Sequence, residues 1–325
     1  MNDLRLISFL PAATEMAFAL GLGDQLVGVS HECDFPAEAR KKPIVVKAAL
    51  PLETMSLREI DITVAQRIGS GQSLYEVDER LLAQLAPTHI LTQELCHVCA
   101  PSGNEITRAL AALPMKPEIL WFTPHSIEEI FRNLRDLGAA TGTAARAEEI
   151  IAAAHARLDK IAALVKKASR ARAYHPRTFC LEWIDPYYCC GHWVPEMVEL
   201  AGGREALGRR GMDSVRIPWE KIAAWAPEVL IVSPCGFNTE KAVTQAEQLL
   251  QQPGWGDLPA VRNGRVLAVD ANAYFARPGP RVVEGVGLLA HLIHPEVFEW
   301  NGPLDAFQKI TPPKKSHRPL VANRA

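Results

Sequence analysis

No stretch of this sequence is long and apolar enough to cross a membrane, because a spanning helix needs roughly 20 consecutive apolar residues and no such run occurs. The apolar-rich segment 4–22 is interrupted by Pro11 and Glu15, and Asp3 offsets the charge of Arg5. It therefore lacks the pattern of an export signal. We expect a cytoplasmic protein with no membrane insertion.

An excess of charge of one sign is also absent. The chain has 35 Lys and Arg residues against 37 Asp and Glu residues, which gives a formal net charge of -2. Binding to nucleic acid or to an anionic membrane through charge needs a basic excess. The balance therefore indicates no nucleic acid as partner and favours a small or medium-sized neutral ligand.

Motifs typical of catalysis are missing as well. The sequence has no Gly-x-Gly-x-x-Gly, no phosphate-binding loop and no nucleophile elbow, and its first strand is followed by Ser8-Phe9-Leu10-Pro11. The sequence therefore favours a binding protein over an enzyme.

What the chain does contain is an alternation of strand-like and helix-like segments that occurs twice. Its 325 residues, 48% of them hydrophobic, are enough for two domains with a core each. The order predicts an α/β fold of two Rossmann-like lobes with parallel sheets. The expected strands are 4–10, 25–30, 89–92, 118–122, 178–183, 229–233 and 265–269; the expected helices are 11–21, 78–85, 103–113, 126–137, 195–201, 219–225, 241–250 and 281–293. A loop rich in Pro and Lys is expected between residues 30 and 78.

Residues 143–173 contain no Gly or Pro and predict one long connecting helix. Its apolar positions, at helical spacing, are Ile151, Ala154, Leu158, Ile161 and Val165. About 29 residues would span roughly 43 Å. A two-helix hairpin is the alternative, but no turn signal interrupts the run. We therefore expect a lobe over 1–142, the helix over 143–173, a second lobe over 174–300, and a mobile, basic, Pro-containing tail over 301–325.

Four short segments with cysteine each follow a strand-like run and form the most informative feature of the chain; they end at Cys33, Cys99, Cys190 and Cys235. Parallel strands place their carboxyl ends at the ligand crevice of an open α/β fold, so these thiols should converge there. Thiolates suit zinc or an iron–sulfur cluster. The candidate metal ligands are Cys33, Cys96, Cys99 and Cys235, with His31, His97 and His192 as nitrogen alternatives.

Other roles for these cysteines stay open. Only one Cys-x-x-Cys pair is present, and residue 100 is Ala, so covalent heme attachment is excluded. The pair Cys96 and Cys99 could act as a redox dithiol. The thiols could also contact cobalt or simply line a cavity. Cys180, inside a strand-like run, is expected to be an inert core residue.

The chain resembles the vitamin B12-binding members of the periplasmic binding proteins, the helical-backbone class that also includes ferric-siderophore receptors. The resemblance covers residues 4–295 and is carried by the long helix, by the opening segment Ser8-Phe9-Leu10-Pro11-Ala12-Ala13-Thr14-Glu15, and by Arg277-Pro278-Gly279-Pro280-Arg281. It is closest to a cobalamin-binding subgroup with His-Glu-Cys-Asp, Cys-x-x-Cys and Pro-Cys-Gly-Phe patterns, found here at 31–34, 96–99 and 234–237.

This resemblance implies a corrinoid, a cobalamin-like ligand, held edge-on in a cleft between the lobes. Aromatic walls suit such a flat ligand because stacking adds to the burial of apolar area. By motif position, the expected walls are Tyr188, Trp219, Tyr274 and Phe275, with Asn272 and Arg277 as polar contacts. Glu182, at a strand end, could hydrogen-bond ligand amides or could simply be solvated.

The resemblance also implies a partner and leaves two alternatives. Exported members of the family deliver ligand to a permease through one surface glutamate per lobe. Glu220 matches the position in the second lobe, whereas the position in the first falls near Asp78-Glu79-Arg80. A corrinoid-binding protein is the leading hypothesis. The alternatives are a thiolate-ligated zinc or iron–sulfur protein on the same fold, possibly an enzyme, and the receptor component of a metal-chelate ABC importer.

Overall fold

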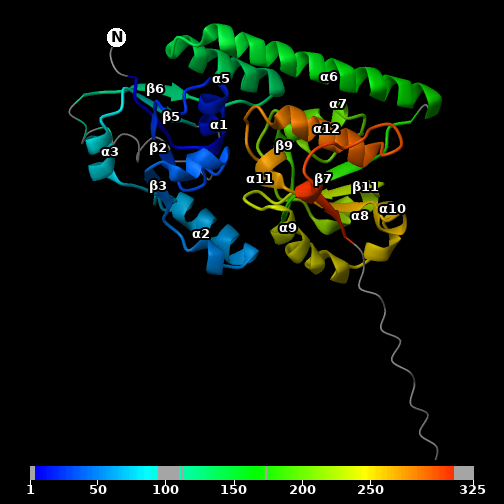
Figure 1. Ribbon diagram of the computed structural model, residues 1–325. Helices are drawn as coiled ribbons and strands as arrows, with labels where there is room; N and C mark the ends of the chain where they lie inside the picture. The colour runs from blue at the N-terminus through cyan, green and yellow to red at the C-terminus, as the bar shows by residue number, and fades with distance from the viewer. Residues whose placement is uncertain (1–3, 94–109, 111–112, 114, 173, 311–325) are drawn as a thin grey trace, which may run out of the picture.

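A computed structural model describes residues 4–93, 110, 113, 115–172 and 174–310. Two sheets lie side by side, and one long helix, α6 (Ala144–Arg172), runs along both of them (Figure 1). This is the two-lobed α/β architecture expected from the sequence. Among the described residues, no helix is both long and apolar enough to span a bilayer.

The first lobe is built around a mainly parallel sheet of order β4-β3-β2-β1-β5-β6, in which only β4 is antiparallel to its neighbour. The strands are β1 (Leu6–Ser8), β2 (Leu26–Ser30), β3 (Ile44–Ala48), β4 (Tyr75–Val77), β5 (His89–Thr92) and β6 (Glu118–Trp121). The helices are α1 (Pro11–Ala19), α2 (Leu57–Gly69), α3 (Glu79–Leu85) and α5 (Ile127–Ala140), with 3-10 turns η1 (Ala37–Lys41) and η2 (Leu52–Thr54).

The second lobe has a sheet of order β13-β12-β11-β7-β8, whose centre is parallel and whose two edge strands are antiparallel. Its strands are β7 (Thr178–Ile184), β8 (Tyr187–Cys189), β11 (Val229–Val232), β12 (Val266–Val269) and β13 (Phe307–Lys309), and β9 (Gly191–His192) pairs separately with β10 (Arg209–Arg210).

The helices of the second lobe surround this sheet. They are α7 (Val194–Leu200), α8 (Trp219–Trp225), α9 (Thr239–Ala246), α10 (Pro259–Arg262), α11 (Ala271–Tyr274) and α12 (Val282–Ile293), with 3-10 turns η3 (Glu247–Gln251), η4 (Trp255–Asp257) and η5 (Leu304–Ala306).

Local sequence explains where several helices begin and end. The side chains of Ser126 and Asn238 accept backbone N–H groups at the starts of α5 and α9. Helices α3 and α8 end in the same way, at a left-handed alanine that precedes a proline: Ala86 and Ala226. This shared ending agrees with two lobes that are versions of one design.

Helix α6 ties the lobes together through apolar packing. A single buried cluster continues from α1 and α5 of the first lobe, along α6, to α7 and α12 of the second. The α6 residues Ala147, Ile151, Ile161 and Val165 are buried in it, and Ala154 and Leu158 pack against it. The helical stripe expected from the sequence is therefore confirmed, and the lobes have a rigid connection on this side.

The second sheet extends further than the expected boundary at residue 300. Strand β13 pairs antiparallel with β12, and Ile310 is only 8% exposed. Phe307 also packs against the core. These apolar side chains hold in place a segment that the sequence analysis assigned to a mobile tail.

Candidate functional site

A cavity of about 570 Å³ opens between the lobes, at the carboxyl end of β7. One wall is Arg58, from α2 of the first lobe, and the rest comes from the second lobe. Its lining residues are Arg58, Ile184, Asp185, Pro186, Tyr187, Arg216, Ile217, Pro218, Gln248 and Gln252. This volume lies in the range of small-molecule and cofactor sites.

Tyr187 provides the aromatic surface of this cavity. Its ring lies 5.6 Å from that of Trp219, which in turn stacks on Trp255 at 6.1 Å. Trp219 is only 7% exposed and donates its indole N–H to the carbonyl oxygen of Pro253 at 2.7 Å. Trp219 was expected to be a cleft wall, but the structure places it behind the wall, where it supports Tyr187.

Tyr188 lies between the lobes, as expected of a cleft residue. Its hydroxyl is 3.0 Å from a carboxylate oxygen of Asp61 in α2, and it accepts the Nε–H of Arg216 at 3.1 Å. The Arg216 guanidinium also lies over the Tyr188 ring, 5.9 Å from its centroid.

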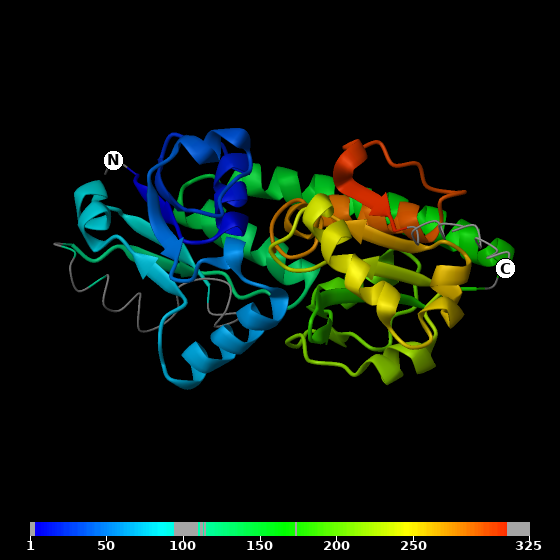
Figure 2. The same ribbon diagram turned by 90° about the horizontal axis from the view of Figure 1, so that it is seen from below.

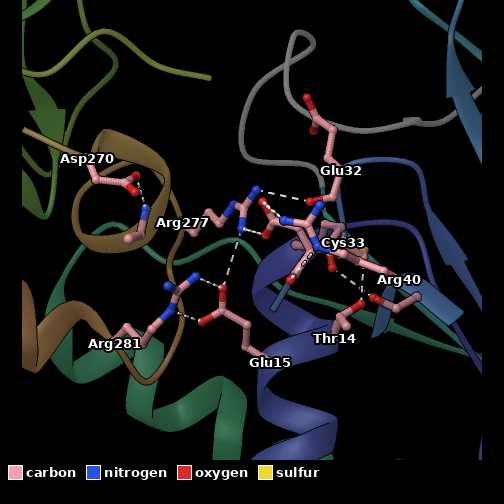
Figure 3. A network of polar contacts seen from close by, with 12 residues as sticks. Thr14, Glu15, Glu32, Cys33, Arg40, Asp270, Arg277 and Arg281 are labelled. Atoms are coloured by element: carbon pink, nitrogen blue, oxygen red, sulfur yellow. Dashed lines mark hydrogen bonds and ion pairs between the residues drawn. The ribbon is translucent and has the colours of Figure 1, made fainter. Parts of the chain in front are cut away.

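Arg277 and Arg281 join the lobes through a buried ionic network (Figure 3). Arg281 donates to both oxygens of Glu15 in α1, at 2.8 and 2.5 Å. Arg277 donates to the carboxylate of Asp34 and, at 3.0 Å, to the carbonyl oxygen of Glu32. The Arg277 side chain is 10% exposed and that of Glu15 is 3% exposed. Arg277, expected as a polar ligand contact, is therefore already occupied by groups of the first lobe.

Burial raises the pKa of Glu15, and the neighbouring Arg281 and Arg277 oppose that effect. Gly279 allows the backbone of its segment to lie close to α1. A Cβ atom at this position would lie 3.3 Å from a carboxylate oxygen of Glu15 and 3.6 Å from the Cα of Ala12. The Arg-Pro-Gly-Pro-Arg segment thus fits closely against the first lobe.

Glu182 turns into the second lobe rather than toward a ligand. It accepts the Ser214 hydroxyl at 2.6 Å and the N–H of Gly191 at 3.3 Å. Burial raises the pKa of its carboxyl. These bonds hold the loop around Ser214 against β7, so the structure gives Glu182 a positioning role in the loop.

Two further aromatic residues expected in the cleft are in the core. Tyr274 is 7% exposed and packs edge-on against Trp300. Phe275 is 2% exposed, and its carbonyl oxygen accepts the indole N–H of Trp193. Asn272 is partly exposed on α11, next to them.

The expected cysteine cluster is not supported by the described part of the chain. Cys33 is buried and accepts a hydrogen bond from Thr14 at 3.0 Å, and burial raises its pKa to about 11, so the free thiol stays protonated at neutral pH. Cys235 is partly buried in the loop after β11, and His31 is exposed. Cys96, His97 and Cys99 lie outside the described residues. Among described residues, no group of three or more His, Cys, Asp and Glu side chains could hold a metal ion.

His192 also lies where the lobes meet, but with other partners. Its ring is 5.8 Å from that of His125 in the first lobe, and its Nε2 is 3.2 Å from Asp213. Burial lowers the pKa of His192, while Asp213 opposes this. Cys180 is fully buried, as expected of a core residue.

The site residues of α2 are not predicted by the sequence, because the segment between residues 30 and 78 is expected to be a loop rich in Pro and Lys. Arg58 and Asp61 both lie in this helix. A signal for it exists: Ser56 and Glu59 form a capping box, with reciprocal side-chain to backbone hydrogen bonds at the start of α2.

The two lobes, the helical connector and the interlobe cavity define a bilobal ligand-binding protein. Residues 6–273 match the family described as "Periplasmic binding protein", and the chain belongs to that family.

Individual proteins are similar to this chain in sequence or in fold. An uncharacterized ABC transporter substrate-binding lipoprotein, YvrC of Bacillus subtilis, is 22% identical over 298 residues, covering 91% of this chain and 81% of the relative. A vitamin B12-binding protein of Vibrio parahaemolyticus is 21% identical over 282 residues, covering 87% and 86%. A periplasmic heme-binding protein of Pseudomonas aeruginosa has a similar fold, with a TM-score of 0.71 at 20% identity, covering 95% and 98%.

The expected cytoplasmic location is wrong on this comparison. YvrC is described as a substrate-binding lipoprotein of an ABC transporter, and the heme-binding protein of Pseudomonas aeruginosa is described as periplasmic. The prediction rested on the absence of an export-signal pattern in residues 4–22. That segment forms β1 and α1 of the first lobe, in agreement with the strand and helix expected there, but a folded segment carries no information about location.

Proposed function

We propose that this protein binds a corrinoid in the interlobe cavity and delivers it to the permease of an ABC importer. The observation that carries the proposal is the cavity itself, which is lined from both lobes and combines one aromatic ring with several polar side chains. Family membership and the vitamin B12-binding relative support the same ligand class.

The polar lining favours a ligand rich in amides. Gln248 and Gln252 offer both donors and acceptors, as the peripheral amides of a corrinoid require. The arginines of the cavity are already paired, Arg58 with Asp185 at 3.0 Å and Arg216 with Asp61 at 2.6 Å. A corrinoid can use the glutamines without displacing these carboxylates.

Heme is the second candidate, because two arginines line the cavity and heme carries two carboxylates. Heme binding would require the ligand carboxylates to compete with Asp185 and Asp61 for those arginines. The heme-binding protein with the same fold supports testing it.

The test is titration of the purified protein with hydroxocobalamin and, separately, with hemin, followed by absorption spectroscopy and calorimetry. Tyr187→Ala removes the aromatic wall and should weaken hydroxocobalamin binding about tenfold, since tenfold corresponds to roughly 1.4 kcal/mol. Tyr174→Ala, at a 43% exposed tyrosine outside the cavity, is the matched control and should bind normally. Absence of hydroxocobalamin binding, or equal affinity in both variants, would reject the proposal.

Glu220 is the residue we propose for permease contact. It is exposed in the first turn of α8. Counted back from the left-handed alanines that end α8 and α3, Glu220 corresponds to Arg80 in the first lobe. The two lobes would therefore present opposite charges to a permease. Glu220→Arg should reduce uptake through the importer and leave hydroxocobalamin affinity unchanged.

A further inference from the structure

Helix α2 belongs to the first lobe in sequence but packs against the second. It extends from the first lobe toward the second lobe (Figure 2). Leu57 is its one buried residue, at 3% exposure. Leu57 does not join the core of its own lobe. It lies in a cluster with Phe179, Leu181 and Ile184 of the second lobe.

Two polar contacts accompany Leu57. Arg58 donates through Nε to both oxygens of Asp185, at 3.2 Å each, and through Nη2 to Oδ1 at 3.0 Å. Asp61 accepts the Arg216 guanidinium at 2.6 Å and lies 3.0 Å from the Tyr188 hydroxyl. The Asp61 side chain is only 10% exposed, although most of α2 faces solvent. These three residues share one end of the helix.

The same contacts form part of the cavity wall. Arg58, Asp185 and Arg216 line the cavity as well as joining α2 to the second lobe. If α2 moved away from the second lobe, Arg58 would leave the cavity and Arg216 would lose its carboxylate partner. Access to the cavity and the docking of α2 are therefore linked by shared side chains.

The docking is weaker than the other junction between the lobes. The arginines of the α2 contacts are 68% and 57% exposed, so solvent screens their ion pairs. Those of the Glu15 network are 10% and 19% exposed. The capping box of Ser56 and Glu59 keeps the first turn of α2 formed. We therefore expect the α2 contacts to open before the Glu15 network does.

We propose that α2 is a clasp over the interlobe cavity and that Asp61 is the positioning residue through which it holds Tyr188 and Arg216. The part of the proposal that concerns ligand release rests on the proposed function. Docked, the clasp completes the wall and slows dissociation of the ligand. Undocked, it leaves the cavity open toward solvent.

Reversing the charges of Asp61 and Arg216, singly and together, tests whether α2 is docked through this ion pair, and the test needs no ligand. Asp61→Arg should raise the hydrogen-exchange rates of the α2 amides at least tenfold, because two arginines then face each other and a detached helix of 13 residues is only marginally stable in water. Asp61→Arg combined with Arg216→Asp should restore the wild-type rates. Glu38→Arg, at an exposed residue of the first lobe, is the control for reversed charge and should leave α2 unchanged. Unchanged α2 exchange in Asp61→Arg would overturn the clasp.

The second measurement is the dissociation rate of hydroxocobalamin. It should rise severalfold in Asp61→Arg and return to the wild-type value in the double variant. Faster exchange with an unchanged dissociation rate would overturn the positioning role of Asp61. If the wild-type protein does not bind hydroxocobalamin, the proposed function fails, and the exchange cycle still decides whether α2 is a docked clasp.

Discussion

Glu15 is the residue on which the buried junction between the lobes depends. Its two oxygens receive the Arg281 guanidinium, and Arg277 lies 3.7 Å away (Figure 3). Removing one partner of a buried ion pair leaves an uncompensated charge, which costs far more than the pair itself contributes. The junction therefore needs Glu15 more than it needs any exposed ion pair.

Glu15→Gln should lower the free energy of unfolding by about 3–5 kcal/mol. Glu149→Gln, which alters a 66% exposed partner of Arg146, should change it by less than about 0.5 kcal/mol. Urea denaturation of both variants is the measurement. A loss below about 1 kcal/mol in Glu15→Gln would show that Arg277 and Arg281 do not need this carboxylate.

Glu205 makes stability depend on pH. Burial raises the pKa of its carboxyl to about 7, although the backbone N–H groups of Gly208, Leu207 and Cys180 lower it. In the unfolded chain the carboxyl has its ordinary pKa of 4.5. Between these two values the folded protein keeps a proton that the unfolded chain has lost, so stability falls as pH rises.

We expect the contribution of Glu205 to reach up to about 3 kcal/mol between pH 4.5 and 7 and to be constant above that window. Glu205→Gln keeps the size of the side chain and removes the titration. Denaturation at several pH values should show a smaller loss with rising pH in the variant. Identical slopes in the two proteins would contradict this assignment.

Single residues were the hardest part of the site to predict. Tyr188 does lie at the lobe interface, whereas Trp219, Tyr274 and Phe275 are buried. Their motif positions place them near strand ends, but position alone cannot say which way a ring points. The partner of Arg277 could not be predicted either, because Asp34 is 243 residues away in sequence.

Helix α12 contains two glycines that differ in the space available for a side chain: Gly285 has none and Gly287 has enough for a methyl group. A Cβ atom on Gly285 would lie 2.3 Å from the carbonyl oxygen of Tyr274, closer than any real contact. A Cβ atom on Gly287 would meet only Arg157 and Ile161 at ordinary distances of 3.8 and 3.9 Å. Gly285 is thus needed for the packing of α12 on α11.

Gly285→Ala should destabilise the protein, since the backbone of α11 must shift to make room. Gly287→Ala should stabilise it by about 0.5–1 kcal/mol, because alanine is the better helix former. Thermal unfolding of the two variants is the measurement. Because both are Gly→Ala changes in one helix, the difference in melting temperature separates the steric effect at Gly285 from the helix propensity of alanine. Equal effects from both substitutions would contradict the close approach at Gly285.

Helices with a clear apolar periodicity were predicted well, whereas short strands and one helix in the segment 30–78 were not. The expected helix over 219–225 matches α8, and the expected connecting helix matches α6 within two residues at each end. Strand β3 was missed because Pro43 and three lysines flank or interrupt its short apolar run. Strand β4 has only three residues, and helix α2 was missed although its segment contains neither Pro nor Lys. Strand β13 was missed because it follows the last helix and precedes a basic segment.

At the scale of the whole molecule, the two sides of the lobe junction differ in kind. On the side of α6, one apolar cluster runs through both lobes. On the side of α2, Leu57 is the one buried apolar residue of the helix, and the other contacts are polar and include exposed arginines. A stiff connector with apolar packing permits little hinge motion, so we expect opening to occur mainly at α2.

The central claim is that the ligand lies between the lobes, against Tyr187 and beneath α2. A crystal structure of the protein grown with hydroxocobalamin tests it most directly. The account predicts the corrin ring in the interlobe cavity, in contact with Tyr187 and within hydrogen-bond reach of Gln248 or Gln252. A ring bound on the outer face of one lobe, with this cavity unchanged, would contradict it.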